Sequence, residues 1–362
     1  MAEVTQDQVE ALLSEVQDRY LEQDLVSAKL VKGVNTDGGN VSVRVVLGYP
    51  AGDYCDELKS EISAKLEAAG ISGAEVAVET NIGAHAVQKT VKRQDGIKNI
   101  IAVASGKGGV GKSTTAVNLA LALQADGARV GVLDADIYGP SQPRMLGISG
   151  QPESEDGKTL QPMQNHGLKA MSIGFLIDED TPMIWRGPMV TQALEQLLND
   201  TQWGELDYLV VDLPPGTGDI QLTLSQKIPV SGAIIVTTPQ DIALLDARKG
   251  LKMFEKVEVP ILGVVENMSM HVCSNCNHVE HIFGEGGGRS MAEQYDVNYL
   301  GGLPLDRAIR EQVDGGNPTV VADPDGKVTA IYKDIARRAT AKLAQQSKDY
   351  STKFPTIKIQ NV

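Results

Sequence analysis

A glycine-rich loop lies between an apolar segment and a helix-forming segment of this chain. Residues 105–114 read Ser-Gly-Lys-Gly-Gly-Val-Gly-Lys-Ser-Thr and match the pattern G-x-x-x-x-G-K-[ST]. The apolar run at 100–104 predicts a strand before the loop, and residues 116–123 predict a buried helix after it. In this context, glycines let backbone N–H groups surround phosphate oxygens at the positive end of the new helix. The sequence therefore predicts a nucleotide-binding P-loop.

The expected phosphate-binding residues form one segment: Gly106, Lys107, Gly108, Gly109, Val110, Gly111, Lys112, Ser113 and Thr114. Lys112 is expected to reach the β- and γ-phosphates of ATP, and the Ser113 hydroxyl to bind Mg²⁺. Lys107 follows the first glycine and is not part of the general pattern. Its position resembles the P-loop of the MinD, ParA and nitrogenase iron-protein class. That resemblance implies that Lys107 acts in catalysis on the nucleotide of a partner subunit.

Two further predicted strands deliver carboxylates to the same edge of a sheet. The strand at 129–133 is followed by Asp134 and Asp136, and the strand at 208–211 runs into Asp212. Ligands of open α/β sheets bind outside the carboxyl ends of the strands. An apolar strand ending in one aspartate is the Walker B pattern, so Asp212 is expected to bind Mg²⁺ directly or through water. Resemblance to the MinD class implies water positioning for Asp136 and metal support for Asp134.

Hydrophobic patterning divides the chain into a small α+β domain and a larger α/β domain. In the first part it predicts two helices and three strands: a helix at 6–20, strands at 25–34 and 41–47, a helix at 53–69 and a strand at 74–78. Further along, strands at 233–237 and 261–265 flank a helix at 241–257, which indicates a doubly wound, mainly parallel sheet. The predicted divisions are the α+β domain at 1–87, a linker at 88–97, the P-loop NTPase domain at 98–346 and a tail at 347–362.

The charge balance disfavours non-specific binding to nucleic acid or membranes. The chain has 47 acidic and 33 basic residues, a net charge of −14, which repels phosphate backbones and anionic lipid. The first residues lack the pattern of a signal peptide, and no apolar run approaches the ~18 residues of a membrane span. The last predicted helix, 328–345, has a modest apolar face that favours packing on the sheet over membrane targeting. We therefore expect a cytoplasmic protein without nucleic-acid or membrane partners.

A second chemical site is predicted near the end of the α/β domain. Residues 271–281 contain two of the three cysteines, Cys273 and Cys276, and three of the five histidines. A C-x-x-C pair can share one metal. A structural zinc could take Cys273, Cys276, His278 and His281 within one chain, and spacing alone favours this reading. An iron-sulfur cluster usually has four thiolates and would have to bridge two subunits. A thioredoxin-like disulfide is disfavoured because no helix evidently begins after the pair.

Family resemblance favours the cluster over zinc. Glu266-Asn267-Met268-Ser269, the C-x-x-C pair and the glycine-rich segment 282–288 resemble the corresponding region of Mrp/ApbC-type iron-sulfur carriers. The resemblance covers about residues 98–344 and is weaker, resting on element order, over the N-terminal domain. It implies that Asn267 reads adenine and that the cysteines bind a [4Fe-4S] cluster. Many relatives have proline and glycine where this chain has Ser274 and Asn277. Cys55 is interpreted as a half-buried residue in the first turn of a helix.

Together these expectations describe an ATP-binding, slowly hydrolysing iron-sulfur cluster carrier. The resemblance implies a homodimer with Lys107 reaching across its interface, and it implies transfer of a bridging [4Fe-4S] cluster to recipient apoproteins. Cluster-assembly scaffold proteins are further expected partners. Two other classes stay open: a positioning ATPase of the ParA or MinD type, and a zinc-stabilised ATPase adaptor.

Overall fold

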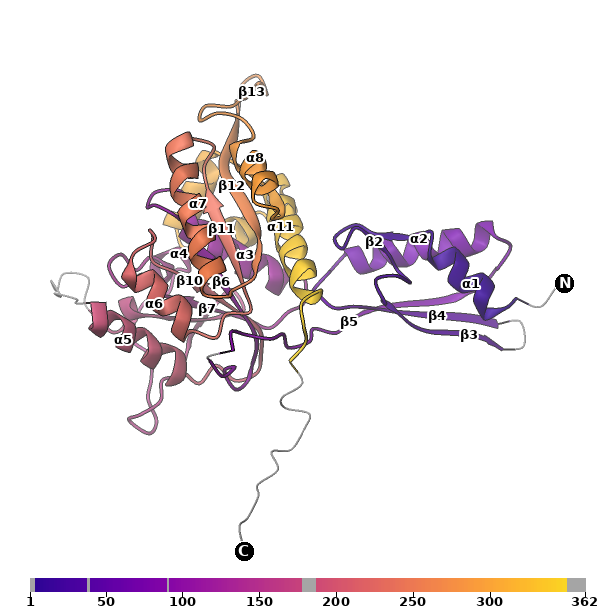
Figure 1. Ribbon diagram of the computed structural model, residues 1–362, viewed down its shortest axis with the longest axis horizontal. Helices are drawn as coiled ribbons and strands as arrows, with labels where there is room; N and C mark the ends of the chain where they lie inside the picture. The colour runs from indigo at the N-terminus through magenta and orange to yellow at the C-terminus, as the bar shows by residue number, and fades with distance from the viewer. Residues whose placement is uncertain (1–3, 38–39, 90, 178–186, 350–362) are drawn as a thin grey trace, which may run out of the picture.

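The computed structural model describes residues 4–37, 40–89, 91–177 and 187–349. These residues form two hydrophobic cores, one in the small N-terminal domain and one in the larger domain that carries the P-loop. Figure 1 shows the two domains side by side, with the N-terminal domain extending away from the larger one. The predicted fold class, a doubly wound and mainly parallel sheet preceded by a small α+β domain, is confirmed.

The N-terminal domain has the predicted succession of larger elements plus a small two-stranded ladder. Its elements are α1 (Gln6–Leu13), β1 (Gln17–Asp18), β2 (Gln23–Asp24), β3 (Val31–Asp37), β4 (Asn40–Leu47), α2 (Tyr54–Ala68) and β5 (Glu75–Thr80). The three longer strands form a sheet in the order β3-β4-β5. Four apolar side chains of α2 are buried against it: Tyr54, Leu58, Ile62 and Leu66. Cys55 lies in the first turn of this helix and is half-buried, as predicted.

Two predicted boundaries in this domain are wrong, and buried or turn-forming aspartates explain both. The first helix ends at Leu13 instead of residue 20, because the buried Asp18 carboxylate accepts bonds from the backbone N–H groups of Tyr20 and Leu21 and holds a turn there. The first long strand begins at Val31 instead of residue 25, because the Asp24 carboxylate accepts two backbone bonds and starts another turn. Aspartate competes with regular structure in this way.

The larger domain contains one sheet whose long strands run parallel. Its strands are β6 (Ile97–Ala104), β7 (Val130–Asp134), β8 (Met163–Asn165), β9 (Leu168–Ser172), β10 (Leu206–Asp212), β11 (Gly232–Thr237), β12 (Ile261–Val272), β13 (Val279–Glu280) and β14 (Tyr299–Pro304). The order is β13-β12-β11-β6-β10-β7-β9-β8, with β14 also pairing with β12. The short strands β8 and β13 are antiparallel to their neighbours, and the other pairs are parallel. The P-loop strand β6 is therefore central.

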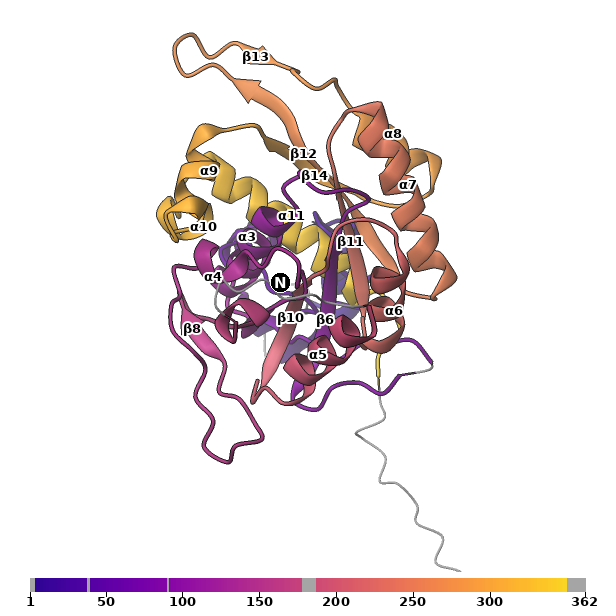
Figure 2. The ribbon, with the colours of Figure 1, turned by 90° about the vertical axis from the view of Figure 1, so that its left-hand side faces the viewer.

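Helices cover both faces of this sheet. They are α3 (Lys112–Ala125), α4 (Gln142–Met145), α5 (Gly187–Asn199), α6 (Asp219–Lys227), α7 (Asp241–Lys256), α8 (Gly287–Gln294), α9 (Arg307–Asp314), α10 (Thr319–Ala322) and α11 (Lys327–Ala344), with a 3₁₀ turn at Ile173–Phe175. Figure 2 shows α3 and α11 on one side of the sheet and α7 and α8 on the other. No helix among the described residues is long and apolar enough to cross a membrane.

The last helix joins the two domains. As predicted, α11 packs on the sheet, against α3 and β14. Its buried Arg337 donates to both oxygens of Asp126, at 2.6 and 2.8 Å, and Asp126 caps the carboxyl end of α3. The same guanidinium pairs with Asp53, which precedes α2 of the N-terminal domain. One buried cation therefore connects the P-loop helix with the small domain.

The segment between the domains is more firmly attached than its polar composition predicts. Gln88, the first residue of the predicted linker, is buried, and its Nε2 donates to the Ser225 carbonyl at 2.7 Å. Residues 347–349, where the predicted tail begins, lie beside 84–86 and exchange backbone bonds of 2.9 and 3.0 Å with them. The rest of that tail, 350–362, lies outside the described residues.

Candidate functional site

The P-loop connects the carboxyl end of β6 with the first turn of α3. Gly109 and Gly111 both have φ of +80°, the left-handed region that glycine adopts without strain. Gly111 also leaves no room for a side chain, since a Cβ there would clash with the Asn267 amide. Gly106 is similarly close to the α7 backbone at Asp246. Conformation or close packing thus explains the glycines at positions 106, 109 and 111 of the predicted loop.

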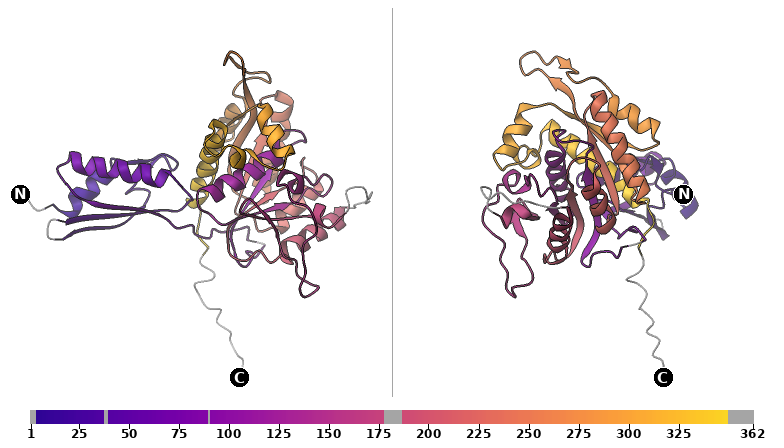
Figure 3. Two further views of the ribbon diagram at one scale, coloured as in Figure 1. Left: turned by 180° about the vertical axis from the view of Figure 1, so that it is seen from behind. Right: turned by 60° about the vertical axis from the view of Figure 1, so that its left-hand side comes forward.

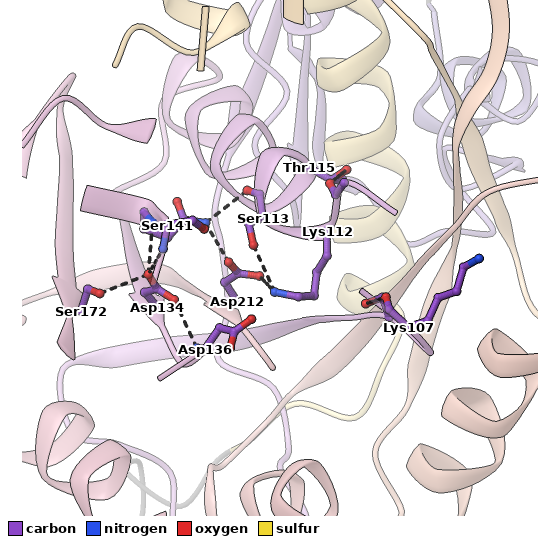
Figure 4. A network of polar contacts seen from close by, with 12 residues as sticks. Lys107, Lys112, Ser113, Thr115, Asp134, Asp136, Ser141, Ser172 and Asp212 are labelled. Atoms are coloured by element: carbon purple, nitrogen blue, oxygen red, sulfur yellow. Dashed lines mark hydrogen bonds and ion pairs between the residues drawn. The ribbon is translucent and has the colours of Figure 1, made fainter. Parts of the chain in front are cut away.

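Lys112 and Asp212 form an ion pair inside the protein. The Lys112 ammonium contacts Asp212 Oδ1 and donates to Ser113 Oγ at 3.2 Å, and the two charged residues are 5% and 0% exposed. Figure 4 shows both side chains beside Ser113. The structure therefore brings together the predicted phosphate-binding lysine and two of the three residues predicted at the Mg²⁺ site, Ser113 and Asp212. Their contact follows from the fold, because β10 lies next to β6 and delivers Asp212 to the same sheet edge.

Asp134 holds the loop that follows its strand. Its Oδ2 accepts from the backbone N–H groups of Ser141 and Gln142, at 2.9 and 3.1 Å, and from Ser172 Oγ at 3.1 Å. Its Oδ1 accepts from the backbone of Asp136 at 3.2 Å. Burial raises the pKa of the Asp134 carboxylate, and the neighbouring Asp212 raises it further. Asp134 thus holds the loop after β7 through three bonds and the end of β9 through one, and it makes no hydrogen bond to Lys112 or Ser113 within the described residues.

Asp136 and Lys107 lie on either side of the buried pair. In Figure 4, Asp136 projects from the loop after β7 close to Asp212, whereas the Lys107 side chain points away from the Lys112 ammonium. Burial raises the pKa of the Asp136 carboxylate, and the charge of Lys112 opposes this shift. The structure thus gathers Asp136 with the other site residues. It leaves Lys107 directed outward.

Gln142, a residue outside the predicted site, joins the end of β10 to the P-loop. Its Nε2 donates to Asp212 Oδ2 at 2.9 Å and to the Ser113 carbonyl at 3.2 Å. The side chain is 1% exposed, and its Oε1 has no hydrogen-bond partner among the described residues. Gln142 lies eight residues beyond Asp134, the last residue of β7, in a polar, proline-containing segment, and no sequence motif marks this position.

Asn267 contacts the P-loop directly. Its Nδ2 donates to the Val110 carbonyl at 2.9 Å, and the residue is 8% exposed. Asn267 lies within β12, the strand that ends immediately before Cys273. The predicted adenine contact stays a prediction. The observed contact joins the P-loop to the strand that carries the cysteines.

The two cysteines lie at the end of a hairpin that projects beyond the body of the sheet. The hairpin is formed by β12 and β13, and it stands out at the top of Figures 1 and 3. Within its loop, the Cys273 N–H donates to the His278 carbonyl and the Asn277 N–H donates to the Cys273 carbonyl, both at 2.9 Å. Asn277 has φ of +58°. Asparagine tolerates this region better than most residues, which explains how it occupies this turn.

The thiols of the hairpin are accessible and one is acidified. Cys276 is exposed and Cys273 is half-buried. The backbone N–H groups of Asn275 and Cys276 lower the pKa of the Cys273 thiol, with a further contribution from the Cys276 side chain. By contrast, burial raises the pKa of the Cys55 thiol. The lowered pKa favours the thiolate of Cys273, which is the form that binds metal.

Two of the three nearby histidines contact the base of the hairpin. His281 Nδ1 is 2.8 Å from the Ser269 carbonyl, and His271 Nδ1 is 2.9 Å from the Leu305 carbonyl. Within the described part of the chain, no three histidine, cysteine, aspartate or glutamate side chains are grouped as a metal site. The four residues of the zinc alternative are therefore not assembled around one point.

The glycine loop, the lysine–aspartate pair and the doubly wound sheet define a P-loop NTPase of the MinD and ParA class. A family model described as ParA, NUBPL iron-transfer P-loop NTPase, matches residues 96–340, and one described as iron-sulfur cluster assembly protein matches residues 6–79. The chain belongs to this family of iron-sulfur cluster carriers. The resemblance read from the P-loop and the cysteine segment is thus confirmed.

Individual relatives agree with this assignment. The chain is 52% identical to the iron-sulfur cluster carrier protein of Escherichia coli (strain K12) over 343 residues, 93% of this chain and 92% of that protein. It is 53% identical to the mouse (Mus musculus) iron-sulfur cluster transfer protein NUBPL over 251 residues, 69% and 79% of the two chains. A solved nucleotide-binding protein from Archaeoglobus fulgidus, in complex with ADP, superposes with a TM-score of 0.56 and 37% identity over 65% of this chain and 91% of that one.

Proposed function

We propose that the chain binds and hydrolyses ATP and carries a bridging [4Fe-4S] cluster as a cytoplasmic homodimer, delivering the cluster to apoproteins. The observation that carries this proposal is the hairpin, which presents two accessible thiols and no third protein ligand among the described residues. A cluster with four thiolate ligands then needs Cys273 and Cys276 from each of two chains. Cluster-assembly scaffold proteins are proposed as donors of this cargo.

The P-loop site is suited to MgATP. The loop N–H groups and Lys112 would bind the phosphates, and Ser113 with Asp212 would hold Mg²⁺, which neutralises charge on the phosphates during transfer. Lys112 exchanges its contact with Asp212 for the phosphates. Asp136 orients the attacking water, and Asp134 supports the metal site indirectly by holding residues 141 and 142. Lys107, directed away from Lys112, would reach the nucleotide of the partner subunit.

Nucleotide and cluster are coupled through β12 in this proposal. The strand contacts the P-loop through Asn267 at 2.9 Å and continues to Val272, next to the first cysteine. A shift of the P-loop on nucleotide binding would therefore be transmitted through Asn267 and β12 to the hairpin. Asn267 lies close enough to the loop that an adenine contact and this coupling role are compatible.

Anaerobic reconstitution with iron and sulfide tests the function. The expected result is about one [4Fe-4S] cluster per two chains, identified by visible and Mössbauer spectroscopy, with a dimer by light scattering. The double variant Cys273→Ala/Cys276→Ala should lose the cluster, and Cys55→Ala, the matched control, should keep it. ATP-dependent transfer to an apo-ferredoxin then tests the carrier step. Zinc as the sole metal of anaerobically purified protein, or a cluster that survives the double variant, contradicts the proposal.

A further inference from the structure

The environment of Gln142 indicates a role in the nucleotide site, although this residue is not part of the P-loop pattern. Its side chain lies between the Walker B carboxylate and the residue that provides the predicted metal-binding hydroxyl. Two side-chain oxygens at this point, Gln142 Oε1 and Ser141 Oγ, are buried without a hydrogen-bond partner among the described residues. A buried polar atom without a partner costs free energy, so such atoms call for an explanation.

The orientation of the Gln142 amide follows from its neighbours. Both groups that it contacts, Asp212 Oδ2 and the Ser113 carbonyl, are acceptors, so the NH₂ group must face them. The carbonyl oxygen is attached to the same carbon, so it stays in the neighbourhood of Asp212 and Ser113 but faces away from them, without a partner among the described residues. It is therefore an acceptor next to the residues that would hold Mg²⁺.

The backbone beneath Gln142 is fixed as well. Asp134 accepts the N–H groups of Ser141 and Gln142, and Ser172 Oγ donates to the same carboxylate oxygen. A side chain that is anchored at its backbone and at its amide nitrogen has little freedom. Its carbonyl is thereby held in one place without having a partner there.

We propose that Gln142 is a positioning residue for the metal of the bound nucleotide. Its Nε2 stays hydrogen-bonded to Asp212 Oδ2, which leaves Asp212 Oδ1 free to bind the cation when Lys112 moves to the phosphates. Its Oε1 accepts a hydrogen bond from a water molecule of the cation's hydration shell, since Mg²⁺ in nucleotide sites usually retains several waters. This inference rests on the proposed binding of MgATP. It adds to the metal site a residue that lies outside the P-loop and Walker B motifs.

The test compares ADP binding with Mg²⁺ and with EDTA. A fluorescent ADP analogue is titrated into the full-length wild type, Gln142→Met and the control Gln164→Met, which alters an exposed glutamine of β8. Methionine keeps the length of the side chain but has no N–H group and only a weak acceptor. We expect the ratio of the EDTA Kd to the Mg²⁺ Kd to fall about tenfold in Gln142→Met, the usual effect of losing hydrogen bonds to charged groups. The Kd in EDTA should stay within threefold of the wild-type value.

Two results overturn the inference: a ratio within threefold of wild type, or weakening of ADP binding by the same factor in EDTA, which indicates a merely structural role. If Gln142→Met does not fold, as judged by circular dichroism, Gln142→Ala is measured with the same criteria. A second readout is the EPR spectrum of Mn²⁺ bound with ADP, which should differ between wild type and variant and contradicts the inference if identical. A wild type without any Mg²⁺ effect counts against the proposed MgATP site itself. That outcome is therefore distinguishable from failure of Gln142 alone.

Discussion

The nucleotide site and the cysteine hairpin differ in how their chemical groups are held. Lys112, Asp212 and Asp134 lie inside the protein, and each is bonded to another part of the same chain. Cys273 and Cys276 lie at the end of a projecting hairpin, and the chain brings no further ligand to them among the described residues. One site is organised by a central sheet. The other depends on what binds to it.

This difference has an energetic meaning. Burying a charge is costly unless it is paired, so the charged residues of the nucleotide site contact each other when no ligand is bound. A ligand then replaces these contacts with its own. The hairpin has no such cost because its thiols are accessible to solvent or to a partner. A site that must release a cluster to other proteins benefits from that accessibility.

The largest expected effect is on folding stability. Lys112→Met leaves Asp212 as a buried carboxylate without its cation, and we expect the free energy of unfolding to fall by about 3–5 kcal/mol. Cys276→Ala, at an exposed position, should cause no measurable change. Urea unfolding of the metal-free and nucleotide-free protein measures both. Adding Asp212→Asn to Lys112→Met should restore part of the loss, because the uncompensated charge is removed. Equal stability of Lys112→Met and wild type would contradict the view that the pair holds the site together.

A second measurement compares thiols in the two domains. The pKa of Cys273 is lowered by backbone N–H groups, whereas the pKa of Cys55 is raised by burial. At pH 7 we expect iodoacetamide to modify Cys273 more than tenfold faster than Cys55, because only the thiolate reacts. The rate at Cys273 should also reach its plateau at lower pH. Peptide mass spectrometry follows each site separately. Similar rates at the two cysteines would show that the hairpin does not activate its thiol.

The parts of this protein that were predictable from sequence are those determined by local patterns. The P-loop, the strand before Asp212 and the helix at 241–257 are each specified by neighbouring residues, and the structure has them within a few positions. The contact between Lys112 and Asp212 joins residues a hundred positions apart, but sheet topology made it foreseeable.

What could not be predicted depended on single side chains acting at a distance. Gln142 has no motif, and its importance appears only when β7, β10 and the P-loop meet. The strand predicted to end at 265 continues to Val272, because the polar residues Glu266, Asn267 and Ser269 interrupt the apolar run but are buried within the strand. Asp18 ended a helix whose apolar spacing continued past it. Hydrophobic periodicity predicts regular helices and strands, but it does not show where a single side chain interrupts them.

The smallest expected effect concerns the connection between the two sites. Asn267→Ala removes the bond from β12 to the Val110 carbonyl, and one neutral hydrogen bond contributes about 1 kcal/mol, or roughly fivefold in an equilibrium. If β12 transmits nucleotide binding to the hairpin, the change in Cys273 alkylation rate that ATP causes should shrink by about this factor. Asn298→Ala is the matched control, because Asn298 contacts the opposite end of β12 at the Leu262 carbonyl. An ATP effect on Cys273 that is the same in Asn267→Ala and wild type would mean that the two sites communicate through another route, with the partner subunit as the next candidate.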